Sequence, residues 1–153
     1  MRVTHEYVQQ VLVDLEKGRD VLLHSLGKCR EIELMEGLTL DELESFEALT
    51  GRFARLSDII IQKAFRTIDM MDLEDSGTVR DRLNRAEKKG IIEDASDFVE
   101  IRILRNEIAH EYKSEVIYSM FQKVIVLSPL LIQCVDRISS YVENNFAPEI
   151  KES

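Results

Sequence analysis

The stretch LESFEALTGRFARLSDIIIQKAFRTI, residues 43–68, decides the fold expected of this chain. Its apolar side chains recur every three or four residues, at Leu43, Phe46, Leu49, Phe53, Leu56, Ile60, Ala64 and Ile68. This spacing collects them on one face of an α-helix, which is normally buried. Thr39 and Glu42, just before it, have the spacing of a capping box, in which each side chain accepts a hydrogen bond from a free backbone N–H. The stretch predicts a long helix with one face in the core.

Helical spacing also dominates the rest of the chain. Only six glycines and two prolines interrupt its 153 residues, and the apolar residues do not alternate as strands require. We expect helices over about residues 4–32, 39–68, 78–89, 94–112 and 114–145, the fourth capped by Asp94 or Ser96. Pro129 should kink or break the last helix, because it lacks an N–H and clashes with the preceding turn. The pattern predicts an all-α fold, an up-and-down four-helix bundle with an additional short helix.

Length and composition favour one soluble domain. Hydrophobic residues make up 44% of the chain and charged residues 32%, which is ordinary for a globular protein. We expect a single helical domain over residues 1–147 and a frayed C-terminal tail over 148–153. No apolar run approaches the roughly 18 residues of a membrane span, and the acidic N-terminus does not resemble a secretion signal. Cys29 and Cys134 lack the spacing of a metal or redox motif, which suits free, buried thiols in the cytoplasm.

The charge of the chain limits which partners it can bind. A formal net charge of −9 argues against non-specific nucleic-acid binding, which depends on cations that contact phosphates. It does not exclude a localised site. Residues 78–90 are locally basic, with Arg80, Arg82, Arg85, Lys88 and Lys89 against Asp81 and Glu87. This segment is either the solvated face of a helix or a basic lip beside a cleft.

Residues 105–112, RNEIAHEY, combine a cation, an amide, an imidazole and a phenol within about two turns of one expected helix. At about 100° per residue, Arg105 falls inside the apolar stripe of that helix. Three polar residues share one edge of the stripe: Arg102, Asn106 and His110. Two acids take the opposite face: Glu107 and Glu111. The segment therefore divides into an outward acidic side and an inward set of reactive groups.

Each of the inward groups has two interpretations. Arg105 either reaches a carboxylate elsewhere, including one across a dimer, or is held half-buried to bind an anion such as phosphate. His110 is either a half-buried hydrogen-bonding residue or an acid–base group. Tyr112 is either packed with its hydroxyl at the rim or available for modification.

The string Arg105-Asn106-x-x-x-His110-x-Tyr112 resembles the RN-x3-H-x-Y motif of the HepT-like branch of the HEPN superfamily. These are small helical proteins encoded beside a minimal nucleotidyltransferase. Residues 83–92, LNRAEKKGII, resemble the short helix and Gly-hydrophobic turn that precede this motif in the family. The specific similarity spans about thirty residues, Leu83 to Tyr112, and the bundle extends it to the whole chain.

The resemblance implies a HEPN-like bundle that acts as the toxin of a toxin–antitoxin pair, a metal-independent endoribonuclease without a cofactor. It implies that Arg105 and His110 are catalytic, that Asn106 supports the site, and that the partner nucleotidyltransferase silences the toxin by adenylylating Tyr112. It also implies a homodimer in which the two motif helices face each other across a cleft. In a chain this acidic, RNA binding would rely on local cations, first of all Arg102 and Arg105.

Two other functions stay open at this point. Some relatives of this kind are substrate-binding or interaction subunits of a nucleotidyltransferase without nuclease activity, in which Arg105 and His110 would bind nucleotide or stabilise a dimer. A purely structural helical protein is the third possibility. RNA cleavage without added metal distinguishes the first function from the other two.

Overall fold

The computed structural model describes residues 3–35, 37–74, 76–110 and 114–151. All regular secondary structure in these ranges is helical. The elements are α1 (His5–Arg30), α2 (Leu40–Asp58), η1 (Ile59–Ala64), α3 (Phe65–Met71), α4 (Val79–Lys88), α5 (Ala95–His110) and α6 (Ser114–Lys151). The all-α prediction is confirmed.

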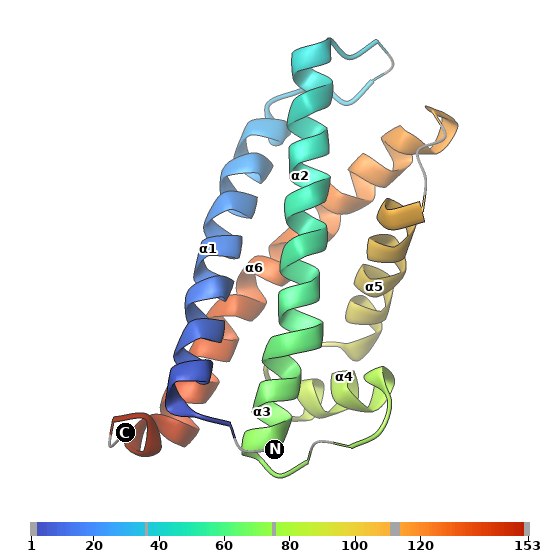
Figure 1. Ribbon diagram of the computed structural model, residues 1–153. Helices are drawn as coiled ribbons and strands as arrows, with labels where there is room; N and C mark the ends of the chain where they lie inside the picture. The colour runs from blue at the N-terminus through green and yellow to red at the C-terminus, as the bar shows by residue number, and fades with distance from the viewer. Residues whose placement is uncertain (1–2, 36, 75, 111–113, 152–153) are drawn as a thin grey trace.

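The helices pack as a bundle with one short helix at its end (Figure 1). α1 and α2 run antiparallel as neighbours, and α6 crosses both of them diagonally. α5 packs against α2 and α6, while the short α4 lies beside α3 and the start of α5. α2, η1 and α3 follow one another without a gap, so Leu40–Met71 forms one long helical rod. Four long helical segments and one short helix therefore correspond to the number expected.

The core is built around the face that residues 43–68 predict. Phe46, Phe53, Leu56 and Ile60 are fully buried, and the ring of Phe46 stacks on that of Phe121 of α6 at a centroid distance of 5.0 Å. Leu43 alone of the eight predicted positions is only half-buried. The same helical stripe therefore supplies the centre of the bundle.

The helix starts follow the expected capping chemistry. The Oγ1 of Thr39 accepts a hydrogen bond from the Glu42 N–H at 3.1 Å, and the Glu42 carboxylate accepts one from the Thr39 N–H at 2.9 Å, which confirms the capping box. A second box, which the sequence analysis did not name, begins α4 with Thr78 and Asp81. Gly90 has a φ of +78°, so this glycine takes the left-handed conformation that commonly follows a helix end.

The last helix differs from the expectation. Pro129 does not break it in two, because α6 runs as one helix from Ser114 to Lys151. A proline removes a single helical hydrogen bond, and here the flanking turns are held in the core by Phe121 and Leu131. The helix also continues past residue 147, where we placed the end of the domain; that boundary stays a prediction.

Length and composition alone would allow α6 to cross a membrane over Ile117–Phe146. About a third of the most apolar window, 33%, is buried inside the bundle. Core helices of globular proteins often have the same composition, so this feature by itself does not choose between a bundle helix and a membrane helix.

Candidate functional site

The motif helix is α5. Its start is fixed by Asp94, whose Oδ1 accepts hydrogen bonds from the Ser96 N–H at 2.9 Å and the Ser96 hydroxyl at 2.7 Å. These hydrogen bonds, first the one from the hydroxyl, lower the pKa of the Asp94 carboxyl. Of the two caps that we considered, Asp94 is thus the one that accepts the bonds. Four apolar residues bury the inner stripe of the helix: Phe98, Ile101, Leu104 and Ile108. Ala109, which helical spacing also assigns to this stripe, is exposed.

Arg105 forms a two-point ion pair with a carboxylate on another helix. Its Nε donates to Oδ1 of Asp58 at 2.9 Å, and its Nη2 donates to Oδ2 at 2.9 Å. The hydrogen bond with Asp58 is the main reason that the pKa of Arg105 is raised. This is the first of the two interpretations of Arg105, an arginine that reaches a carboxylate elsewhere.

The pair with Asp58 leaves part of the guanidinium available. A guanidinium has five N–H donors, and the two on Nη1 take no part in the contact with Asp58. Within the described residues, Nη1 has no hydrogen-bond partner. Asp58 thus fixes the plane of the Arg105 guanidinium, while the N–H groups on Nη1 can still donate hydrogen bonds to an anion.

Asp58 was missed in the sequence analysis. It is the last residue of α2, and the six-residue π-helix Ile59–Ala64 begins directly after it. The wider turn buries both Ile60 and Ile61, and π-turns are frequently found at functional sites. The only signal in the sequence is an acid before three consecutive isoleucines, which gives no indication of its partner.

The other three predicted site residues on α5 are exposed. Arg102, Asn106 and His110 all lie on the solvent side of the helix, so the prediction that Asn106 and His110 belong to an inward set is wrong for a single copy of the chain. None of the three makes a side-chain hydrogen bond or ion pair within the described part of the chain. Tyr112 and Glu111 lie outside the described residues.

Arg105 and His110 do not converge within one chain. Five residues separate them, which corresponds to about 7.5 Å along the helix axis and about 140° around it. Arg105 is directed to α2 by its bond with Asp58, whereas His110 is exposed at the last position of α5. Within one copy of the chain, these two side chains therefore do not form one assembled centre.

Two cations of the basic segment around α4 have structural roles. The buried carboxylate of Asp69 accepts hydrogen bonds from Arg85 at 2.9 Å and from Lys89 at 3.0 Å. Lys89 also contacts Asp72 at 2.8 Å, and the Tyr141 hydroxyl donates to Asp72 at 2.8 Å. Burial, followed by this hydrogen bond, raises the pKa of Tyr141 to about 12. Two of the five cations of the segment are thus used to join α3, α4 and α6.

The position of α4 also argues against a basic lip beside His110. α4 lies near the first turn of α5, and His110 is the last residue of α5 (Figure 1). The 15 residues between Ala95 and His110 correspond to about 22 Å of helix. The interpretation as a structural and solvated helix face is the one that this geometry supports.

Both cysteines are buried and free, as expected. Burial is the main cause of the raised pKa of each thiol, so both are held in the unreactive protonated form. In the described ranges, no group of three or more His, Cys, Asp or Glu side chains is arranged to hold a metal ion. These residues contribute to packing rather than to the candidate site.

Comparison of the chain with protein-family models, with curated proteins and with solved structures found no match.

Proposed function

We propose that this protein is a metal-independent endoribonuclease of the HepT-like HEPN type, in which Arg105 and His110 perform the chemistry. The observation that carries the proposal is the ion pair in which Arg105 donates two hydrogen bonds to the Asp58 carboxylate. This pair fixes the orientation of the guanidinium and leaves Nη1 free for a phosphate oxygen. Asn106 and His110 follow on the same helix, exposed to solvent. The biological role would be that of a cytoplasmic toxin, paired with a minimal nucleotidyltransferase as antitoxin.

The residue types suit cleavage by the 2′-hydroxyl of the substrate. The 2′-oxygen attacks the adjacent phosphorus, the P–O5′ bond breaks, and the products carry a 2′,3′-cyclic phosphate and a 5′-hydroxyl. His110 would take the proton of the 2′-hydroxyl or return one to the departing 5′-oxygen. Arg105 would stabilise the added charge on the pentacoordinate phosphate. Because DNA lacks the 2′-hydroxyl, this chemistry is restricted to RNA.

The separation of Arg105 and His110 supports a homodimer. Ile103 lies two turns before His110 on the same face of α5 and is 54% exposed, and the neighbouring Val126 of α6 is 63% exposed. Both line a groove of about 350 Å³ between α5 and α6. A second copy that covers this apolar surface would bring the two exposed α5 faces together, so that the half-sites of both copies face one another.

Ile103→Asp tests the dimer. We expect the wild type to be dimeric and Ile103→Asp to be monomeric and to cut RNA poorly, because a carboxylate would have to be desolvated in the interface. Light scattering gives the mass and an RNA cleavage assay gives the activity. Leu23→Asp is the matched control, since Leu23 is 51% exposed on α1 and should tolerate the change. A wild type that is monomeric and active, or an Ile103→Asp variant that stays dimeric, would contradict this dimer.

Substitutions of Arg105 and Asp58 test the proposed nuclease activity. We expect Arg105→Ala to lower metal-free RNA cleavage by roughly 10²–10³-fold, as for loss of a donor to the transition state. Asp58→Asn should lower it by roughly 10- to 100-fold through misplacement of the guanidinium. Because both side chains of the pair are partly exposed, Asp58→Asn should cost less than about 1 kcal/mol in free energy of unfolding.

One control variant accompanies this comparison. Arg137→Ala removes an arginine from a solvent-exposed pair with Glu93 and should leave cleavage unchanged. Cleavage by Arg105→Ala at the wild-type rate would contradict the catalytic assignment, and full activity of Asp58→Asn would reduce the pair to a structural contact. A wild type that neither cuts RNA nor arrests growth would favour the alternative function, an interaction subunit of a nucleotidyltransferase.

Tyr112 completes the proposal as the site of regulation. Its adenylylation by the partner nucleotidyltransferase would place a bulky anionic group two residues from His110. The added negative charge would repel the RNA phosphate from the cleft, which gives a physical reason for the inhibition.

A further inference from the structure

A second feature of the surface is the groove along the seam between α1 and α2. Two hollows, of about 490 and 610 Å³, meet there, and Ala48 and Arg52 line both of them. Small residues are among those that line the groove, namely Gly18, Ala48 and Gly51. A side chain added at Gly51 would meet nothing within 4 Å, so the backbone of α2 is directly accessible from this side.

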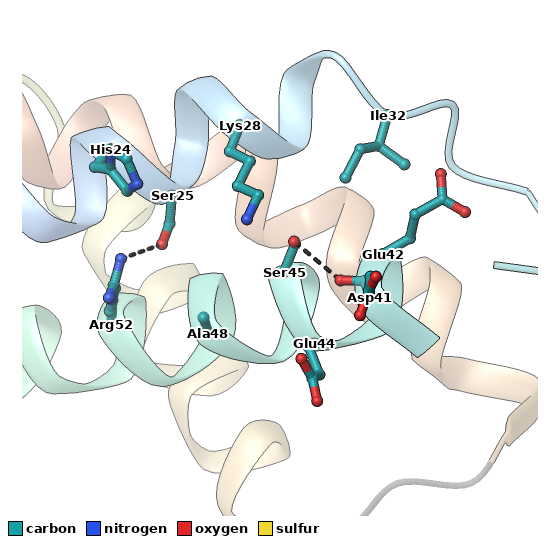
Figure 2. A pocket seen from close by; sticks show the side chains of 10 residues that line it. All are labelled: His24, Ser25, Lys28, Ile32, Asp41, Glu42, Glu44, Ser45, Ala48 and Arg52. Carbon is teal, nitrogen blue, oxygen red and sulfur yellow. Dashed lines mark hydrogen bonds between the residues drawn. The ribbon is translucent and has the colours of Figure 1, made fainter. Parts of the chain in front are cut away.

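The middle of the groove is lined by basic and imidazole side chains from both helices, namely Lys17, His24, Lys28, Arg52 and Arg55. Arg52 is fixed in place, since its Nη1 donates to the Val21 carbonyl at 3.2 Å and to the buried Ser25 hydroxyl at 2.7 Å (Figure 2). None of the five has an ion pair with a carboxylate in the described ranges. Four of the five are cations at neutral pH, against four carboxylates in the lining of the two hollows, so any excess of positive charge is local to the part of the groove around Arg52 and Arg55.

Acidic residues are confined to the two ends of the groove. Asp14 lies at one end and accepts a hydrogen bond from Gln10. At the other end, Glu42 is engaged in the capping box, while Asp41 and Glu44 are exposed (Figure 2). The span from Lys17 to Lys28 covers about 16 Å of helix, enough for several successive phosphates. The groove therefore fits a short polyanion that is bounded by acids at both ends.

This groove leads towards the proposed catalytic arginine. Ile59 lines the end of the groove where α2 passes into η1, and the preceding residue is Asp58, which binds Arg105 of α5. In Figure 1, α2 stands between α1 and α5, so a strand leaving the groove has only this helix to cross.

We propose that the α1–α2 groove binds the phosphate backbone of the single-stranded RNA that is cut at Arg105 and His110. This inference rests on the proposed nuclease function. Lys28 and Arg55 would contact phosphates as mobile cations. Arg52, which is hydrogen-bonded to the Ser25 hydroxyl and the Val21 carbonyl, would present its remaining N–H donors in a fixed orientation. Backbone contacts of this kind do not depend on base identity, so the groove contributes affinity and the α5 site determines where the chain is cut.

The test measures RNA binding by anisotropy of a labelled single-stranded oligonucleotide, in the His110→Ala background so that the RNA stays intact. Lys28→Gln/Arg55→Gln removes two cations that make no described bond. We expect it to weaken binding about tenfold and to lower the slope of log K against log salt by about 1.4. Lys63→Gln/Arg137→Gln makes the same change of net charge away from the groove and should change neither quantity.

The outcomes separate this inference from the nuclease proposal. If wild type cuts RNA but Lys28→Gln/Arg55→Gln binds it normally, or if the control pair weakens binding equally, the groove is not the RNA path and the nuclease proposal is unaffected. If RNA binds through the groove but is never cut, the nuclease proposal fails and the groove stands as a nucleic-acid site. If the protein binds no RNA, both fail.

Discussion

Replacing His110 with alanine should lower metal-free RNA cleavage by roughly 10²–10⁴-fold, the usual contribution of a general acid or base. His110 ends α5, is exposed and makes no described side-chain contact, so its removal should leave the stability nearly unchanged. The measurement compares initial rates of cleavage in the presence of a chelator, together with thermal unfolding of both proteins. A large loss of rate at an unchanged Tm is the signature of a chemical role.

The control for this experiment is His5→Ala. His5 is a partly buried histidine at the start of α1, outside the proposed site, and its replacement should leave the rate at the wild-type value. Equal rates for His110→Ala and the wild type would remove His110 from the mechanism. A comparable loss in His5→Ala would indicate a general effect on the fold.

Replacing Asp69 with alanine should destabilise the protein by about 3–5 kcal/mol, as expected when one partner of a buried ion pair is removed. The side chain of Asp69 is only 3% exposed, and it is shared by Arg85 and Lys89. Without it, both cations stay partly buried with fewer acceptors. Equilibrium unfolding in urea gives the free energy, and the midpoint should fall sharply with little change in slope.

Asp20→Ala is the comparison for Asp69→Ala. Asp20 pairs with Arg19 on the exposed side of α1, where an ion pair typically contributes less than about 1 kcal/mol. A similar small loss in Asp69→Ala would show that the Asp69 cluster is not important for stability. The contrast thus tests whether the basic residues of α4 hold the end of the bundle together.

Much of the fold could be predicted because local spacing determines it. The stripe that contains Phe46 and Phe53, the capping box at Thr39 and the glycine at position 90 all act within one or two helical turns. Pro129 shows the limit of such reasoning, because packing on both sides keeps α6 in one piece. The π-helix after Asp58, which buries both Ile60 and Ile61, is equally outside what local spacing predicts.

The candidate site was predictable only in part. Helical angles correctly placed Arg105 towards the interior, but they also assigned Asn106 and His110 to the inward set, and both are exposed. They could not identify Asp58, which lies 47 residues away in sequence, nor could they show that Lys89 and Arg85 are bound to Asp69. Such pairings depend on how the helices pack together, and the charges of a single segment do not specify them.

The most direct test of the central claim is the chemistry of the RNA ends after incubation with the purified protein in a chelator. Attack by the 2′-hydroxyl predicts a 2′,3′-cyclic phosphate on one fragment and a 5′-hydroxyl on the other, and no cleavage of an RNA with 2′-O-methyl groups. The same ends should form roughly 10²–10³-fold more slowly with Arg105→Ala. Cleavage that requires a divalent metal, or that leaves 3′-hydroxyl and 5′-phosphate ends, would contradict the proposal.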